Sequence, residues 1–589
     1  MMQQNNGWFQ LESQRSVGNS QIKSRGISSS PPVPEPILPR QETVTDKYPG
    51  GFTPGQKSPS ENMMTNHSQL QTNIHLQEYP DFTAAWQPNT VSERSTPPQQ
   101  GNLINEAMGT LSYAGMTNQN SLAPLPKPPS ENMPENHYEP QGTSPLWADD
   151  RALNTLHSQT VGERGPVLTQ DSILHETLET FIHTKILERP VHVKGFGAFG
   201  FFQTMQSMRE YTKLSFLQIP GQQVPVLVRF SLAGGNKGTP DTSRNVRGFS
   251  TKFYMDEGIF DLLCNHIPVF LVRDGIRFPE AFTSLAPSPV NNLIDPERFW
   301  KFVARAPEAT HFVTWLYSDV GTIRSFRHIR GFGVNTYVWR NAEGVRRYVK
   351  YHWIPFAGEE YIDRQEAATL AGMNPDIAGQ DLYDTIAAGT PVQYELRVQL
   401  MDPRDESSLP YDPLDCTKVW DEQRYPLLPV GRLTLNRNPD NYMEQVEKVA
   451  FSPTNLLNGA ELSDDKLLQA RANIYFDSQR RRLGQNFRSI PVNHQENWTP
   501  DEQLTSGDGR HVEGQLVRSE LPDPDNFTQA GERYLSLSPE GQNHLVDNLA
   551  ADLAAVSSET QSIVLGYLHS ASAELGQRVA AQIATYARR

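Results

Sequence analysis

An arginine and a tyrosine spaced four residues apart are the side chains best suited to hold a metal in this chain. They occur in RANIYFDSQRRRLGQNF (Arg471–Phe487), where Arg471 and Tyr475 would share one face of a helix. A guanidinium held against a phenol favours the phenolate, whose oxygen is a hard anionic ligand suited to ferric iron. Arg482 lies two turns further on, so the same face could also clamp an anion. A solvated basic helix is the alternative interpretation of this segment.

A histidine between two valines precedes a glycine-rich stretch in RPVHVKGFGAFG (Arg189–Gly200). We expect the imidazole of this residue, His192, to be partly buried and available as an acid or a base. The alternative is a core histidine whose hydrogen bonds are satisfied internally. The glycines do not form a phosphate-binding fingerprint, because GFGAFG lacks the GxGxxG order and its strand–helix context.

Charged and polar side chains also interrupt the apolar segments that follow. Arg229, Arg244 and Arg247 punctuate predicted strands, where a guanidinium must be paired or must hold an anion. Internal salt bridges are the alternative for these arginines. Asn265 and His266 precede a continuous apolar run, and this polar pair could orient a small substrate.

The two cysteines, Cys264 and Cys416, exclude a disulfide scaffold and any Cys-rich zinc or iron–sulfur site. A nucleophilic pair of Cys264 with His266 is disfavoured. In a strand the two side chains would share a face, but two rises of about 3.3 Å hold them too far apart for an easy hydrogen bond.

The elements that must position these residues belong to a chain of 589 residues with a formal charge of -15. Such an acidic chain is a poor partner for nucleic acid, because phosphate binding needs a basic surface. No apolar run approaches the roughly 18–20 residues that span a bilayer. The start of the chain, MMQQNNGWFQ, lacks the features of a secretory signal. We therefore expect a soluble cytoplasmic protein that binds neither nucleic acid nor membrane.

Composition divides the chain into three predicted parts. Residues 1–150 are rich in proline and polar side chains, and we predict a disordered low-complexity extension there. Residues 151–495 form the predicted core, and residues 496–589 a C-terminal helical region. Two similar segments, KSPSENMMTNH (Lys57–His67) and KPPSENMPENH (Lys127–His137), are a repeated binding motif, a duplicated linker or drift in a biased composition.

The core alternates predicted strands with helices. Strand-like composition recurs in five segments: Val224–Leu232, Arg247–Met255, Ile267–Asp274, Val345–Phe356 and Val392–Met401. The stretch Glu297–Ser318 is helical, and its proline at position 307 should divide it into two helices. Helical periodicity returns over His544–Val556 and Ile563–Ala587. This pattern indicates a large antiparallel sheet or barrel embedded in helices.

Several long motifs, taken together and in order, resemble the haem-dependent (monofunctional) catalase family. RPVHVKGFGAFG resembles the family's RVVHARGFGAHG, and LCNHIPVFLVRD resembles GNNTPVFFIRD. IYFDSQRRRLGQNF followed by IPVN resembles YxDTQRxRLGxNY followed by PVN, and GRLTLNRNPDNYMEQVEKVAFSPTNL also matches closely. The resemblance covers the chain from about Gly162 to Asn493.

The resemblance implies an α+β fold with an antiparallel β-barrel core, surrounding helices, a long wrapping connection and a C-terminal helical region. It implies haem b (iron protoporphyrin IX) as cofactor and decomposition of hydrogen peroxide to water and dioxygen through a ferryl intermediate. It also implies a role in protection against oxidative stress and a homotetramer. The stretch from about Asp150 to Leu187 matches the part of the family that lies across neighbouring subunits.

Carried over by position, the resemblance implies catalytic roles for His192, Asn265 and Ser231, and iron ligation by Tyr475. It implies that the haem contacts are made by eight residues: Arg189, Arg229, Phe270, Phe278, His328, Arg471, Tyr475 and Arg482. Among these, three arginines would hold the propionates, Arg471 would pair with the tyrosinate, and His328 would lie near the proximal face.

Six positions depart from the family's pattern: Ala233, Asn245, His266, Leu271, Val320 and Glu422. The first four bear on the substrate channel, where Asn245 replaces an aspartate and Ala233 replaces a valine. They leave two alternatives open: a haem peroxidase or organic-hydroperoxide-converting enzyme on this scaffold, and a weakly active haem protein with a partner-binding N-terminal arm. Val320 and Glu422 argue against NADPH binding.

Overall fold

The computed structural model describes residues 157–183, 185–494, 513–521 and 524–586. The extension predicted for residues 1–150, the repeated segments within it and the predicted domain boundaries at 150 and 495 lie outside these residues. The polar stretch after the core lies largely outside them as well.

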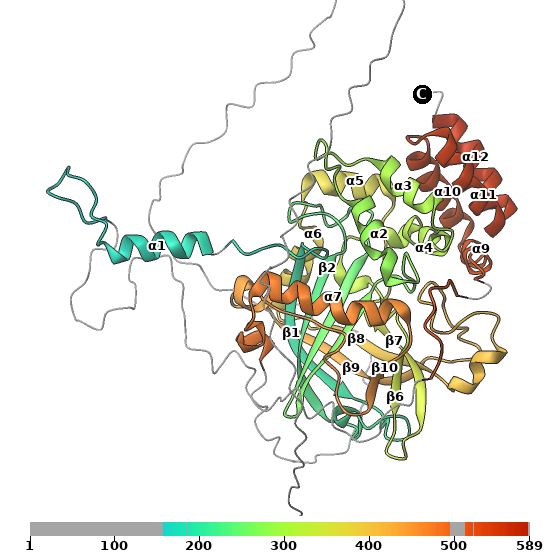
Figure 1. Cartoon of the computed structure of the whole chain (residues 1–589), viewed down its shortest axis with the longest axis horizontal. Coiled ribbons are helices and arrows are strands. Elements are labelled where there is room, and N and C mark those ends of the chain that lie inside the picture. The colour runs from blue at the N-terminus through green and yellow to red at the C-terminus, as the bar shows by residue number, and fades with distance from the viewer. Residues whose placement is uncertain (1–156, 184, 495–512, 522–523, 587–589) are drawn as a thin grey trace, which may run out of the picture. The chain divides into compact units, whose positions relative to one another are not determined.

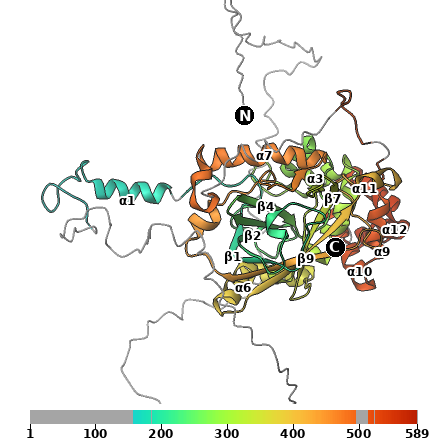
Figure 2. The ribbon, with the colours of Figure 1, turned by 90° about the horizontal axis from the view of Figure 1, so that it is seen from below.

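Eight antiparallel strands close into a barrel. Their order around the ring is β7-β5-β4-β3-β2-β1-β9-β8, and the pairing of β8 with β7 completes the closure. The ring strands are β1 (Gly195–Thr204), β2 (Gln223–Leu232), β3 (Arg247–Met255), β4 (Gly258–Asn265), β5 (Gly331–Phe332), β7 (Arg346–Pro355), β8 (Val392–Met401) and β9 (Leu428–Arg437). Two further strands, β6 (Tyr337–Arg340) and β10 (Ala460–Leu462), extend the sheet beyond β7. Figure 2 shows β1, β2, β4, β7 and β9 around a common centre. Closure removes the exposed edges that an open sheet of this length would present.

Alternating side chains fill the barrel interior with aromatic rings. The ring centroids of Phe230 and Phe249 lie 4.6 Å apart, and Phe249 stacks on Trp353 at 5.6 Å. Because the side chains of a strand alternate between its two faces, the residues next to these rings point outward. Arg229 and Ser231 are therefore on the outer face of β2, on either side of the inward Phe230.

Helices pack around the barrel, except α1, which stands apart from it (Figure 1). The described helices are α1 (Ser172–His183), α2 (Phe278–Leu285), α3 (Pro296–Ala304), α4 (Ala309–Leu316), α5 (Arg364–Met373), α6 (Ile377–Ala387), α7 (Lys466–Leu483), α9 (Thr528–Leu535), α10 (Pro539–Leu553), α11 (Ser558–Ala571) and α12 (Ala573–Tyr586). The last four pack with α3 and α4 around one apolar cluster. This arrangement confirms the α+β barrel fold with a C-terminal helical region.

The segment after β9 wraps along the outside of the barrel and contains α7 (Figures 1 and 2). Tyr475 of α7 and Ile490 pack against outward side chains of β2 to β4, such as Leu227 and Leu263. The outer face of these three strands is therefore covered by α7, and the space between the two elements is where the predicted site residues meet.

Most predicted elements agree with the structure, and one strand is wrong. Pro307 separates α3 from α4 as expected. The segment Ile267–Asp274, predicted as a strand, is irregular, because β4 ends before it at Asn265. Its apolar side chains are buried in the helical cluster, which contains Ile267 and Val272. A run that is apolar at every position indicates that the segment is buried, but it does not indicate that the segment pairs as a strand.

The segment of helical periodicity over Ile563–Ala587 is helical as predicted in its described residues, and it contains two helices. It is divided into α11 and α12 at Ser572, whose backbone is extended. The Ser572 hydroxyl then accepts a hydrogen bond from the Leu575 N–H at 3.3 Å, at the start of α12. A serine at such a position caps a new helix.

Candidate active site

Four residues of adjacent strands form a row on the outer face of the barrel. Gly195 of β1 lies opposite Ser231 of β2, which lies opposite Gly248 of β3, which lies opposite Asn265 of β4. A Cβ atom added to Gly248 would lie 2.7 Å from Nδ1 of His192 and 2.6 Å from Oγ of Ser231. The imidazole therefore lies directly on the backbone of Gly248, between Ser231 and Asn265. The register of four strands brings together the three residues predicted for catalysis.

His192 is held in this place by its backbone and by one ring nitrogen. Its φ of 60° is in the left-handed region, which is uncommon for a residue with a side chain and is found at functional sites. Its N–H donates to the Ala233 carbonyl at 3.0 Å, and Nδ1 is hydrogen-bonded to Ser231 Oγ at 3.0 Å. Nε2 has no hydrogen-bond partner among the described residues.

The surroundings of His192 keep its imidazole neutral. Burial, together with the positive charges of Arg229, Arg471 and Arg189, lowers the pKa of His192 to about 3. A neutral imidazole with one nitrogen engaged can accept a proton at the other.

The tyrosine on α7 is part of a continuous chain of hydrogen bonds. Asp465 caps the start of the helix, accepting from the N–H groups of the first turn. Its other oxygen accepts from the Asn335 amide at 2.6 Å, and the Asn335 oxygen accepts from Arg471. Arg471 Nη2 then donates to the Tyr475 hydroxyl at 3.2 Å. The predicted contact between Arg471 and Tyr475 is thus present, supported from behind by two residues that the sequence analysis did not single out.

The predicted proximal histidine does not belong to this chain of contacts. His328 ends the 3₁₀ turn Phe326–His328, and its Nδ1 lies 3.0 Å from the Gly358 carbonyl. Its Nε2 lies 3.9 Å from a Glu360 carboxylate oxygen. The side chain beside Arg471 is Asn335, so the placement of His328 at the proximal face needs correction. The motif FRHIRGFGVN contains both residues seven positions apart, and spacing alone did not show which one turns inward.

Three buried arginines gather on the same side of the barrel. Arg229 donates to the carbonyls of His192 and Val193 at 2.9 and 3.0 Å. Arg189 and Arg482 both donate to the backbone of the segment 446–449, to the Glu447 carbonyl at 2.7 and 2.6 Å respectively. Loop, strand and helix residues that are far apart in sequence therefore form one cationic cluster.

The cluster contains more positive than negative charge. Glu447 is its one acidic side chain among the described contacts, 3.3 Å from Arg189. The Nε atoms of Arg229 and Arg482 are buried and have no hydrogen-bond partner in the described part of the chain. Buried guanidinium groups with unused donors and no second carboxylate are suited to bind an anion.

The other two arginines of the predicted strands are structural. Arg247 donates to four backbone carbonyls, among them those of Asp241 at 2.7 Å and Gly321 at 2.9 Å. Arg244 donates to the carbonyls of Leu316 and Ser318, both at 2.8 Å. Most donors of both guanidiniums are engaged by loop backbone, although Arg244 Nη2 and Arg247 Nε have no hydrogen-bond partner in the described part of the chain. These contacts give both arginines a structural role.

His266 and Cys264 also have structural roles. The N–H of Arg247 donates to His266 Nδ1 at 3.0 Å, which places the proton on Nε2, and Nε2 donates to the Val320 carbonyl at 2.9 Å. Burial lowers the pKa of His266 to about 3, so it stays neutral. Cys264 points into the barrel, where burial raises the pKa of its thiol. Neither side chain is suited to nucleophilic chemistry.

The predicted apolar pair is part of an aromatic group at the edge of the helical cluster. Phe270 and Phe278 have nearly parallel rings, 6.3 Å apart, and Phe282 packs on Phe278 at 4.3 Å. All three join the cluster that contains Ala233, whose carbonyl holds the His192 backbone. The aromatic group therefore belongs to the same apolar cluster as the residue that holds the His192 backbone.

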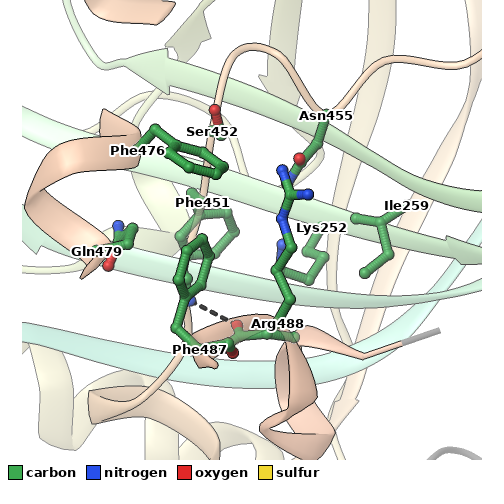
Figure 3. A pocket seen from close by; sticks show the side chains of 11 residues that line it. Lys252, Ile259, Phe451, Ser452, Asn455, Phe476, Gln479, Phe487 and Arg488 are labelled. Carbon is green, nitrogen blue, oxygen red and sulfur yellow. Dashed lines mark hydrogen bonds between the residues drawn. The ribbon is translucent and has the colours of Figure 1, made fainter. Parts of the chain in front are cut away.

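A pocket lies beside the site, between α7, the barrel and the turn after α7. Figure 3 shows the rings of Phe476 and Phe487 on one side of it and Arg488 reaching across it. Lys252, in its wall, is ion-paired with the Asp261 carboxylate at 2.8 Å. The buried lysine is thus neutralised within the protein, and the anion-binding character of the region comes from the arginine cluster.

The comparisons with known proteins agree with this arrangement. A closed barrel that carries a buried neutral histidine opposite a tyrosine–arginine pair defines an enzyme of the peroxide-decomposing class. The family model for catalase matches residues 149–520, and the model for the catalase-related immune-responsive region matches residues 520–583. The chain therefore belongs to the catalase family, and hydrogen peroxide is its substrate.

Individual relatives and structures support the same assignment. The chain is 39% identical over 473 residues to a catalase of Helianthus annuus, covering 75% of this chain and 96% of that protein. It is also 39% identical over 470 residues to Catalase-1 of Arabidopsis thaliana, covering 75% of this chain and 94% of that one. Catalase A from Saccharomyces cerevisiae superimposes with a TM-score of 0.69 and 32% identity, covering 72% of this chain and 96% of that chain. A bacterial catalase gives a TM-score of 0.69 and 34% identity, over 76% and 98%. These matches favour catalase activity over the peroxidase and weakly active alternatives.

The departure at Asn245 has a structural explanation that the sequence did not reveal. Its side-chain oxygen accepts from the Gly234 N–H at 3.0 Å, and its amide donates to the Gly234 carbonyl at 3.1 Å. The amide is thus committed to the loop after β2. An aspartate could accept the first hydrogen bond but could not donate the second.

We expect Asn245→Asp to destabilise the protein by about 1–3 kcal/mol, because the Gly234 carbonyl loses its donor and faces a carboxylate. The melting temperature should fall, and the rate of peroxide decomposition should not increase. Asn236→Asp is the matched control, since the Asn236 side chain only accepts, from the Gly238 N–H at 2.9 Å, and aspartate retains that bond. A faster enzyme with unchanged melting temperature would show that the channel charge matters more than the loop.

Proposed function

We propose that this catalase holds haem b between the outer face of β2–β4 and α7, with the Tyr475 oxygen as the iron ligand. The charge of the arginine cluster is the observation that carries this proposal. Three buried guanidiniums, with Lys237 at the edge, against the single carboxylate of Glu447 leave an excess of positive charge that suits the two carboxylates of iron protoporphyrin IX. The unused Nε donors of Arg229 and Arg482 fit the same ligand.

Each side chain then has a distinct task. Haem supplies the iron redox chemistry by which one peroxide is reduced to water and a second is oxidised to dioxygen. The chain of contacts from Asp465 through Asn335 to Arg471 holds a guanidinium donor against the Tyr475 oxygen and so fixes the position of that oxygen. A phenolate ligand is the one expected for a haem catalase.

The residues on the barrel face bind peroxide and move its proton. His192 Nε2 takes a proton from one oxygen of hydrogen peroxide and returns it to the other, which is general acid–base catalysis by a single group. The Ser231 hydroxyl accepts from Nδ1 and so keeps Nε2 unprotonated before each turnover. Asn265, next in the row, orients peroxide by hydrogen bonding. Phe270 and Phe278 keep the approach apolar.

Replacing the iron ligand tests the cofactor assignment. Tyr475→Phe keeps the ring and removes the anionic oxygen, so haem content should fall sharply or the ferric absorption spectrum should change to that of a weakly ligated form. Phe476→Tyr, which alters the next residue on the same helix, is the control and should leave the spectrum as it is. Normal haem content with an unchanged spectrum in Tyr475→Phe would exclude this tyrosine as the ligand.

Replacing the proton carrier tests the mechanism. His192→Ala should bind haem but lose oxygen evolution from hydrogen peroxide by several orders of magnitude, because no other described titratable side chain lies in its place. Asn265→Ala should cost less, since it orients and does not transfer a proton. His328→Ala, a histidine outside the row, serves as the control in the oxygen-electrode assay. Near-normal oxygen evolution by His192→Ala would overturn the mechanism.

We also propose a homotetramer in which α1 contacts a neighbouring subunit. None of the residues of α1 is buried, although Leu178 and Ile182 are apolar, are four residues apart and are 51% and 62% exposed. A helix with an uncovered apolar face is suited to pack against another chain.

Polar substitutions on α1 test this assembly. Leu178→Ser combined with Ile182→Ser should convert tetramers to smaller species, measured as mass in solution by light scattering, because the apolar contact would be lost. Glu176→Gln with Glu179→Gln, on the same helix, should leave the mass unchanged. A full-sized oligomer in the double serine variant would show that α1 is not needed for assembly.

The cellular role remains a proposal. Decomposition of hydrogen peroxide would protect the cell against oxidative stress, and the predicted location is the cytoplasm. Because Val320 and Glu422 argue against it, we do not expect the chain to bind NADPH. No described helix combines the length and apolar character needed to cross a membrane. Fractionation of cells that produce the full chain would test the location.

A further inference from the structure

The carboxylate inside the arginine cluster has a position that the proposed function leaves unexplained. Glu447 ends the π-helical turn Met443–Glu447, and its side chain is only 1% exposed. One of its oxygens lies 3.3 Å from Arg189 Nη1 and 3.8 Å from Lys237 Nζ. The other accepts from the Tyr442 hydroxyl at 3.4 Å. The Glu447 carboxylate is therefore enclosed by Arg189, Lys237 and Tyr442. Without it, the two cations would have only a ligand as their charged partner.

The backbone of the same turn holds two of the arginines. Arg189 Nη2 donates to the carbonyls of Val446, Glu447 and Val449, and Arg482 donates to those of Glu447 and Val449. A turn that accepts so many bonds from two guanidiniums orients both of them. Gly197 permits this approach, because a Cβ there would lie 2.5 Å from the Val446 side chain. The turn and its carboxylate thus form one wall of the cluster.

The charges around Glu447 keep it ionised. Burial alone would raise the pKa of its carboxyl, but Arg189, Lys237, Arg229 and Arg482 hold that pKa below its usual value. Burial lowers the pKa of the Arg189 guanidinium, and the like charges of the nearby Arg229 and Arg482 act in the same direction. Without Glu447, three buried cations would repel one another with no internal partner.

We infer that Glu447 is a resident counter-ion of the arginine cluster, which positions the guanidiniums before the cofactor arrives and competes with the cofactor carboxylates for them afterwards. This inference rests on the proposed haem site. It gives Glu447 two opposite effects: the carboxylate stabilises the protein without cofactor, and it weakens the hold on a dianionic cofactor. A fixed negative charge beside two others is unfavourable in a site of low dielectric constant.

The test compares two ligands that differ only in charge at the cluster. Haem b carries two carboxylates, and its dimethyl ester carries none. The ratio of their dissociation constants for one variant, measured by absorbance titration of the haem-free full chain, reports the electrostatic contribution of the cluster. Because both ligands bind the same haem-free protein, any change in its stability cancels in the ratio.

Glu447→Gln should raise the preference for haem b over the ester by about tenfold, because the cluster loses its carboxylate and its net positive charge rises by one. The haem-free variant should also unfold at a temperature lower by roughly 3 °C or more. Glu444→Gln is the matched control. It lies in the same turn, but its carboxylate is 42% exposed and paired with Lys448, so both measurements should equal those of the unaltered protein.

Lys237→Gln provides a second arm if Glu447→Gln does not fold. Lys237 is 49% exposed and is the fourth cation near the Glu447 carboxylate. Its removal should lower the preference for haem b over the ester, opposite in sign to the effect of Glu447→Gln. An unchanged or reduced preference in Glu447→Gln, or an increased one in Lys237→Gln, would overturn the inference. Failure of the unaltered protein to bind haem b would instead overturn the proposed haem site.

Discussion

Buried positive charge is the constraint around which this molecule is organised. Arg189, Arg229 and Arg482 come from a loop, a strand and a helix that are far apart in sequence, and all three are withdrawn from water. Withdrawing a guanidinium from water is costly unless its donors and its charge are matched. The protein matches them with the backbone carbonyls of residues 192–193 and 446–449 and with one carboxylate. The match is incomplete, and the excess of positive charge is the observation on which the proposed haem site rests.

A second consequence of the fold is that the two sides of the site are held by different means. The histidine side depends on strand register, because His192 lies on a glycine and between two residues that neighbouring strands place beside it. The tyrosine side depends on a helix whose N-terminal cap, Asp465, is also the first member of the chain of contacts that ends at Tyr475. The same aspartate, Asp465, therefore caps the helix and helps to orient Tyr475. A substitution at the start of α7 would therefore alter the position of the proposed iron ligand, Tyr475.

The structure shows that two of the departures from the family's pattern, Asn245 and His266, make hydrogen bonds within the fold. Asn245 replaces an aspartate expected in the channel, yet its amide is engaged with the Gly234 backbone, and His266 bridges β3 to the Val320 carbonyl. Both substituted side chains are engaged in internal hydrogen bonds of this chain. They do not require a different reaction, in agreement with the comparisons that place the chain among catalases.

The sequence by itself determined the family and the barrel, and it predicted most of the residues of the proposed site. Motifs such as RPVHVKGFGAFG carry side chains whose chemistry is local, and their order along the chain was enough to assign His192, Asn265 and Tyr475 to one site. Pairing of Arg471 with Tyr475 also followed from helical spacing, because residues four apart on a helix are neighbours whatever surrounds them.

Only the tertiary structure decided which polar side chains serve the site and which serve the fold. Arg229 and Arg247 both lie in strands, but Arg229 faces the cluster, whereas Arg247 donates to four loop carbonyls. Asn335 and Glu447 were missed, and His328 was misplaced, for the same reason. Their partners lie more than a hundred residues away or across a turn, and no local pattern encodes such contacts. Side-chain types and their spacing indicate which chemistry is available. Strand register and burial decide whether a charged group faces the site or is paired within the fold.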